Sequence, residues 1–233
     1  MSDNTPAILP EPDAEAKKRS LLLQQYISNA CEKAGGWIRF ADFMNIALYQ
    51  PGLGYYSGGL QKFGQRGDFI TAPEVSPLFA MCLASQLAEV MAGFRNMSGE
   101  AVCILEFGAG SGILAADVLL ELEQLGCLPE KYLILELAAE LRQRQKQTIA
   151  RKAPHLLDTV LWLEQLPEEA VNAVVIANEV LDAMPVECFR VAEAGSELKV
   201  ESLMTGIENA ELVARYQPAD AFVQEKIVDI QQR

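Results

Sequence analysis

The sequence lacks the residues on which several common chemistries depend. It has one histidine, His155, and its five cysteines include no C-x-x-C pair. We therefore expect neither a Ser-His-Asp arrangement nor a metal site. Lys and Arg number 19 against 32 Asp and Glu, which gives a net charge of −13. Since a phosphate backbone is bound by clustered positive charge, we expect no nucleic-acid partner.

Signals for export or membrane insertion are also missing. Residues 1–19 are acidic and contain proline, with no apolar stretch typical of a signal peptide. The apolar runs have the length of strands and none approaches the length needed to cross a bilayer, so we expect no membrane insertion. The odd number of cysteines favours reduced and mostly buried thiols. We predict a cytoplasmic protein with a disordered acidic tail over residues 1–19.

A glycine-rich turn over residues 102–117 is the strongest positive signal. The segment reads VCILEFGAGSGILAAD: an apolar strand, then Gly108, Gly110 and Gly112, then a helical pattern. Glycines allow a sharp turn and a close approach of the backbone to a ligand. The G-x-G-x-G spacing favours a methionine-bearing nucleoside over the dinucleotide of a G-x-G-x-x-G turn. A glycine-rich connection without a ligand is the alternative.

An acidic residue ends the next predicted strand. Residues 131–145 read KYLILELAAELRQRQ, with Glu136 lying 24 positions after Gly112. In doubly wound folds an acidic side chain at this place binds ribose hydroxyls. We therefore predict that Glu136 binds ribose. The alternative is an ordinary solvated carboxylate at a strand end.

Three polar residues follow the predicted strand at residues 173–177. Asn178, Glu179 and Asp182 come before Pro185, at the strand end where open α/β sheets bind ligands. We interpret them as the lining of a site. Either Asn178 or Glu179 could instead cap the turn that follows.

The order of elements predicts an α/β fold with a parallel sheet. Strands and helices alternate only after residue 99, and two strands joined at residues 194–196 suggest a C-terminal β-hairpin. We predict helices at residues 20–35, 40–48, 76–94, 113–125 and 138–152, strands at 102–107, 132–136, 159–163 and 173–177, and the hairpin at 188–193 and 198–203.

Four motifs resemble the MidA family of S-adenosylmethionine-dependent methyltransferases, which includes a mitochondrial complex I assembly factor that methylates a protein arginine. The resemblance covers residues 21–213. The motifs are ALYQPGLGYYS (residues 47–57), FGQRGDFITAPEVSPLFA (63–80), LEFGAGSG (105–112) and ANEVLDAMPV (177–186). The resemblance implies a Rossmann-like class I methyltransferase sheet with its strands in the order 3-2-1-4. It divides the chain into a tail (1–19), a helical region (20–98) with a loop over the cofactor (63–75), a cofactor-binding core (99–187) and a hairpin with a polar end (188–233).

The resemblance also assigns roles to individual residues. S-adenosylmethionine is the implied cofactor, and the glycine turn would hold its methionine part. The implied cofactor-binding residues are Gly108, Gly110, Gly112, Glu106, Glu136, Asp68, Thr71 and Glu74. The alternative for this loop is a helix-capping and turn segment, and Thr71 or Glu74 could serve both purposes. Asn178, Glu179 and Asp182 would be catalytic, with the two carboxylates orienting a substrate arginine.

Family members run on well past the length of this chain, which we therefore expect to be C-terminally truncated. An incomplete sheet would leave a strand edge open, so self-association is expected there. The predicted function is methylation of an arginine in a protein such as a respiratory-complex subunit. The alternative is a non-catalytic assembly or binding factor that keeps only cofactor affinity. A nicotinamide oxidoreductase is disfavoured by the spacing of the glycines.

Overall fold

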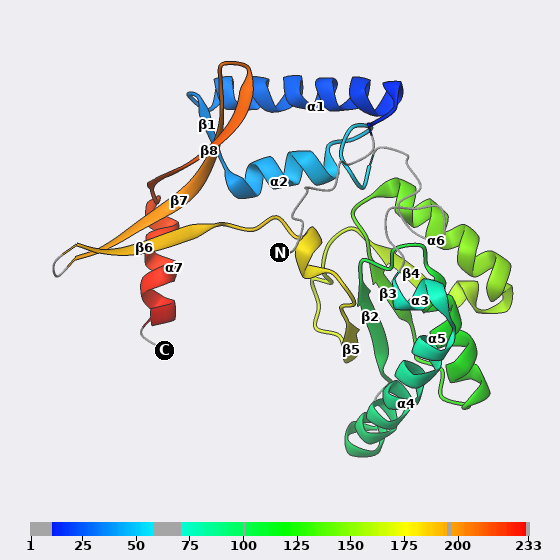
Figure 1. The fold of residues 1–233 in the computed structure, drawn as a ribbon. Helices are drawn as coiled ribbons and strands as arrows, with labels where there is room; N and C mark the ends of the chain where they lie inside the picture. The colour runs from blue at the N-terminus through cyan, green and yellow to red at the C-terminus, as the bar shows by residue number, and fades with distance from the viewer. Residues whose placement is uncertain (1–10, 58–70, 100, 195–196, 232–233) are drawn as a thin grey trace, which may run out of the picture. The chain divides into compact units, whose positions relative to one another are not determined.

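The computed structural model of the chain describes residues 11–57, 71–99, 101–194 and 197–231 (Figure 1). It divides into two compact units. One unit is Tyr55–Met184, and the other combines Met1–Gly54 with Pro185–Arg233. This division differs from the four consecutive regions predicted, because a strand near the N-terminus pairs with a strand from the C-terminal segment.

A parallel sheet forms the centre of the larger unit. Its strands lie in the order β4-β3-β2-β5, and all three pairings are parallel. The strands are β2 (Cys103–Phe107), β3 (Tyr132–Leu135), β4 (Val160–Leu163) and β5 (Ala173–Ile176). The predicted order 3-2-1-4 and the Rossmann-like α/β class are therefore confirmed.

Helices pack on this sheet in a row (Figure 1). α5 contacts both α4 and α6, and the short α3 contacts α4 and α5. The helices of this unit are α3 (Ala72–Val75), α4 (Leu78–Ser98), α5 (Ile113–Gln124) and α6 (Ala139–Lys152), with 3-10 turns at Pro154–Thr159 and Leu181–Ala183. Buried side chains of α4, α5 and α6 form one apolar core with buried side chains from one face of the sheet.

Helix α4 corrects the expectation that no apolar run is long enough to cross a bilayer. Its segment Leu78–Met97 is long and apolar enough to cross a membrane by length and composition. Ala80, Ala84, Leu87 and Met91 recur at helical spacing and belong to the core. Since a core helix passes the same test, this segment is weak evidence for a membrane span.

The face of the parallel sheet that points away from the packed helices is covered unevenly. Leu161, Leu133, Leu105 and Val175 lie in register across the four strands. The two inner leucines are each 6% exposed, whereas Leu161 is 45% and Val175 56% exposed. Within the described residues β5 pairs with β2 alone. The open edge expected at the fourth strand is therefore present in this part of the chain.

In the part of the chain that the structure describes, the smaller unit is an antiparallel sheet with three helices. Its elements are α1 (Ala14–Lys33), β1 (Trp37–Arg39), α2 (Phe40–Tyr49), β6 (Phe189–Ala194), β7 (Glu197–Glu208), β8 (Glu211–Pro218) and α7 (Ala221–Gln231). The predicted hairpin is confirmed as the antiparallel pair β6 and β7. β1 and β8 were not predicted, because one is three residues long and the other is mostly exposed, with weak alternation.

Two further expectations are corrected by local structure. α1 begins at Ala14, inside the predicted tail, because Asp13 Oδ1 accepts a hydrogen bond from Ala16 N at 2.7 Å and caps the helix. All five cysteines are unpaired, as expected. They are not mostly buried: Cys31 is buried, Cys82 is exposed, and the other three are half-buried.

Candidate active site

The glycine turn leaves β2 in a backbone conformation that favours glycine. The φ angles of Gly108, Gly110 and Gly112 are 62°, 53° and 81°, in the left-handed region that side chains with a Cβ rarely adopt. Gly108 N donates to Leu135 O at 3.0 Å, which ties the turn to β3. A Cβ on Gly108 would have Val180 Cγ2 as its nearest neighbour, at 3.8 Å. Conformation, and not lack of space, therefore requires glycine at position 108.

Gly112 is constrained by packing as well. A Cβ at this position would lie 2.9 Å from the Cα of Gln145, closer than real Cβ contacts occur. The start of α5 can approach the backbone of α6 this closely only because residue 112 has no side chain. The third glycine of the turn thus serves helix packing, a role that sequence reasoning did not separate from cofactor binding.

Glu136 lies at the carboxyl end of β3 and is only 6% exposed. Its Oε1 accepts from Ala138 N at 3.0 Å, and its Oε2 accepts from Gln145 Nε2 at 3.1 Å. Burial raises the pKa of its carboxyl, and these hydrogen bonds and the charge of Arg142 oppose that rise. The alternative of a solvated carboxylate is therefore wrong. Ribose binding by Glu136 stays a prediction.

Glu106 is buried beneath the turn. It is 2% exposed, and its Oε2 accepts a hydrogen bond from the Tyr132 hydroxyl at 2.9 Å. Burial raises the pKa of Glu106 to about 7, although the Tyr132 hydrogen bond opposes that rise. The structure thus places this predicted cofactor ligand in the core, against β3.

The predicted covering loop is described only from residue 71. Asp68 lies outside the described residues. Thr71 precedes α3 and makes no side-chain capping bond, so the capping alternative fails for its hydroxyl. Glu74 accepts a hydrogen bond from Ser111 Oγ, which attaches α3 to the glycine turn.

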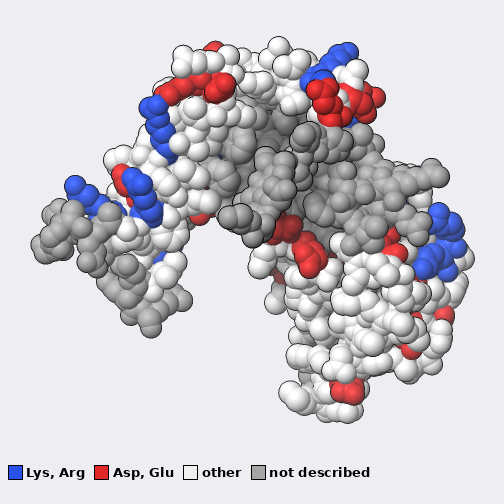
Figure 2. Space-filling view, in the orientation of Figure 1, with Lys and Arg blue, Asp and Glu red and all other residues white. Residues whose placement is uncertain are grey.

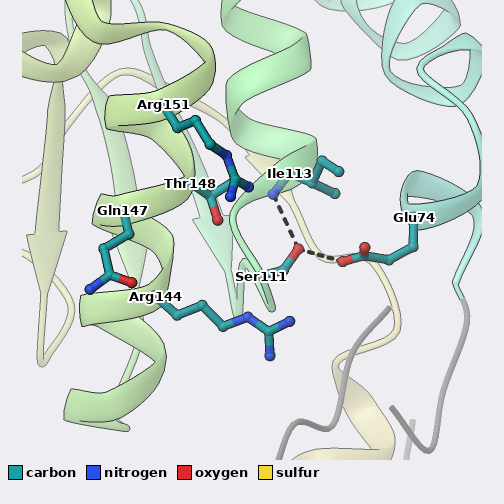
Figure 3. A pocket seen from close by; sticks show the side chains of 7 residues that line it. All are labelled: Glu74, Ser111, Ile113, Arg144, Gln147, Thr148 and Arg151. Atoms are coloured by element: carbon teal, nitrogen blue, oxygen red, sulfur yellow. Dashed lines mark hydrogen bonds between the residues drawn. The ribbon is translucent and has the colours of Figure 1, made fainter. Parts of the chain in front are cut away.

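A cavity of about 320 Å³ lies beside this contact (Figure 3). α6 provides one wall, and the glycine turn, the start of α5 and α3 provide the other (Figure 3). The lining residues are Glu74, Ser111, Ile113, Arg144, Gln147, Thr148 and Arg151. Basic side chains gather over α6 on the face shown in Figure 2. The predicted cofactor turn therefore borders a polar cavity.

The polar residues after β5 lie at the same edge of the sheet as the glycine turn, because β5 and β2 are parallel neighbours. Asn178 is half-buried, and Glu179 and Asp182 are exposed. Glu179 has a φ of 54°, which is uncommon for a residue other than glycine and often marks a functional position.

Tyr56 interacts electrostatically with two of the predicted site carboxylates, Asp182 and Glu136. Burial raises the pKa of its hydroxyl, and the negative charges of Asp182 and Glu136 raise it further. Tyr56 therefore lies within electrostatic reach of both the predicted substrate carboxylate and the predicted ribose carboxylate. Its ring packs edge-on against Tyr55 at a centroid distance of 5.1 Å.

Residues 82–232 match a family described as "Putative S-adenosyl-L-methionine-dependent methyltransferase". This match covers more than half of the chain. The chain belongs to this family.

Similar proteins agree with the assignment. Protein arginine methyltransferase NDUFAF7 of Danio rerio is 30% identical over 70% of this chain and 42% of its own length. The Homo sapiens protein of the same name is 26% identical over 82% of this chain and 48% of its own length. A "likely methyl transferase" from Burkholderia thailandensis, solved bound to S-adenosyl-homocysteine, is 41% identical with a TM-score of 0.78. That match covers 95% of this chain and 56% of the solved one. The resemblance inferred from the motifs is confirmed, and the chain spans about half the length of these relatives.

Three residues of the candidate site were not predicted from the sequence. Ser111 lies within the glycine turn, and Tyr56 lies within the 47–57 motif, so proximity to a motif could have indicated both. Gln145 belongs to no motif, but it lies four residues from both Leu141 and Ile149, a helical spacing that places it on the apolar side of its helix, unlike Gln143 and Gln147.

Proposed function

We propose that this chain binds S-adenosylmethionine at the glycine turn and Glu136 and that it methylates an arginine of a protein substrate. The observation that carries the proposal is the placement of the turn and the buried carboxylate at the ends of the adjacent parallel strands β2 and β3. The Burkholderia thailandensis protein, bound to S-adenosyl-homocysteine, supports the choice of cofactor.

The residues of the site fit this cofactor chemically. Ribose hydroxyls are donors, and the carboxylate of Glu136 keeps acceptor capacity beyond the two hydrogen bonds it makes within the protein. Exposed backbone at Gly108 allows a ligand to approach the turn. The start of α5 also directs backbone N–H groups toward the turn.

Arginine as the substrate is supported by the names of the curated relatives and by the chemistry of the β5 end. A guanidinium is oriented well by carboxylates, which can bind it through two parallel hydrogen bonds. Glu179 and Asp182 are exposed carboxylates at the required edge of the sheet, and Asn178 adds a neutral polar group beside them.

The bound cofactor supplies a methyl group that is already activated by the positively charged sulfur. The protein residues therefore act mainly by holding the nucleophile in line, which is a proximity effect. Glu179 and Asp182 orient the guanidinium, and a carboxylate oxygen of this pair accepts the proton that the arginine nitrogen loses.

Calorimetry with S-adenosyl-homocysteine and with NADH tests the cofactor. We expect binding of the former alone, and the reverse result would refute the proposal. Transfer of labelled methyl groups to an arginine-containing protein tests the reaction. Asp182→Asn should lower transfer with unchanged S-adenosyl-homocysteine affinity, whereas Glu168→Gln, on an exposed residue, should change neither. Binding without transfer in the unmodified chain would instead favour the non-catalytic binding factor.

A further inference from the structure

Gln145 is a fully buried polar residue in an otherwise polar helix. It lies in α6 and is 0% exposed, whereas Gln143 and Gln147 on the same helix are exposed. Burying an amide is unfavourable unless its donors and acceptor find partners. The partners of Gln145 therefore indicate why this position carries an amide.

The side chain of Gln145 makes three hydrogen bonds to three different elements. Its Nε2 donates to Gly110 O at 3.2 Å and to Glu136 Oε2 at 3.1 Å. Its Oε1 accepts from Trp162 Nε1 at 2.9 Å. Because an indole nitrogen only donates and a backbone carbonyl only accepts, these partners determine the orientation of the amide. One side chain thus joins the glycine turn, the end of β3 and the strand β4.

The backbone at Gln145 is held in place by the turn it supports. A Cβ on Gly112 would come within 2.9 Å of the Cα of Gln145. α6 also contacts α5. The amide therefore has a short, fixed reach to Gly110 and Glu136, and a displacement of either partner would break a hydrogen bond.

We propose that Gln145 is a positioning residue that sets the glycine turn and the Glu136 carboxylate at the separation required by the cofactor. This inference rests on the proposed function, in which the turn holds the methionine part and Glu136 holds the ribose. Gln145 acts through these two groups, and no contact of its own with the cofactor is needed.

The hydrogen bond from Gln145 also affects the charge of Glu136. Of the groups around that carboxyl, Arg142 favours the ionised form, while Glu106 and Tyr56 interact with it electrostatically. The amide donor of Gln145 lowers the pKa of Glu136 against the effect of burial. Removing the donor should raise this pKa, so the ionised acceptor would be lost at a higher pH.

The test is Gln145→Met, which keeps the length of the side chain and removes both donors. Gln143→Met is the matched control, because Gln143 is an exposed glutamine on the same helix. Trp162→Phe removes the third hydrogen bond of the amide and leaves its two cofactor-side bonds in place. Two quantities are measured: the titration of the Glu136 carboxyl by ¹³C NMR in the ligand-free protein, and the S-adenosyl-homocysteine dissociation constant as a function of pH.

We expect Gln145→Met to raise the Glu136 titration midpoint and to weaken S-adenosyl-homocysteine binding roughly ten- to hundredfold, as for loss of a hydrogen bond to a charged group. Trp162→Phe and Gln143→Met should leave the midpoint unchanged. Equal midpoints in Gln145→Met and the unmodified protein would overturn the inference. If Gln145→Met does not fold, Gln145→Asn, whose shorter amide cannot span the three partners, provides the same comparison. A failure of the unmodified protein to bind S-adenosyl-homocysteine would refute the proposed function, whereas binding by that protein with an unchanged Glu136 midpoint in Gln145→Met would overturn the role of Gln145 alone.

Discussion

The buried pair of Glu106 and Tyr132 should make the stability of this protein depend on pH. Burial raises the pKa of Glu106 from 4.5 to about 7 in the folded protein. In the unfolded chain the carboxyl regains its ordinary value. Between these two values the folded state holds more protons than the unfolded state, so stability falls as the pH rises through this window. At pH values above the folded-state pKa, the free energy of unfolding has lost this whole contribution and no longer changes with the titration of Glu106.

The magnitude follows from the gap between the two pKa values. At about 1.4 kcal/mol for each pH unit, the gap corresponds to roughly 3 kcal/mol of unfolding free energy. Burial and the nearby Glu106 raise the pKa of Tyr132 well above 10, so its hydroxyl remains a donor throughout. Glu106→Gln keeps the volume and an acceptor oxygen for Tyr132 and removes the titrating group.

Urea unfolding of the unmodified protein and of Glu106→Gln between about pH 5 and about pH 8 measures this effect. Groups that titrate in both proteins cancel in the difference. We expect similar stabilities at the acid end and an advantage for Glu106→Gln that grows toward roughly 3 kcal/mol at the alkaline end. Glu89→Gln, on an exposed residue of α4, should show no such trend. A difference that stays constant over this range would refute the reasoning.

Three further predictions concern the site and the sheet edge. Glu136→Ala should weaken S-adenosyl-homocysteine binding roughly ten- to hundredfold in calorimetry, because a charged acceptor is lost, and unchanged affinity would exclude the ribose role. Gly112→Ala should destabilise the protein by about 1–3 kcal/mol in thermal melting, because its Cβ would collide with the backbone of α6. Gly126→Ala shares a positive φ of 65° but has open space around it, so it should cost less, and equal losses would contradict the packing argument. We also expect association through the exposed edge of β5 in sedimentation, and Val175→Lys should suppress it. A protein that is monomeric without this substitution would contradict the expectation.

The sequence by itself determined the parallel sheet and predicted where the site lies. Apolar strands, the glycine turn and the polar residues after β5 are local patterns, and local patterns show where strands end and where a parallel sheet binds ligands. The predicted positions of Glu136, Asn178, Glu179 and Asp182 at strand ends followed from them, whereas the strand order came from the family resemblance. The family resemblance added the cofactor.

Tertiary structure decided what each of these residues contacts. Trp37 pairs with Gly206, and most of the chain separates these two residues in sequence. No local pattern could therefore show that both ends of the chain belong to one unit. Gln145 differs from its neighbouring glutamines only because α6 packs that face against the turn. Glu106 has the same carboxyl group as the solvated glutamates, and its burial in the core is the main cause of its raised pKa. Burial and long-range hydrogen bonds arise from the packing of elements, which the order of residues in one segment does not specify.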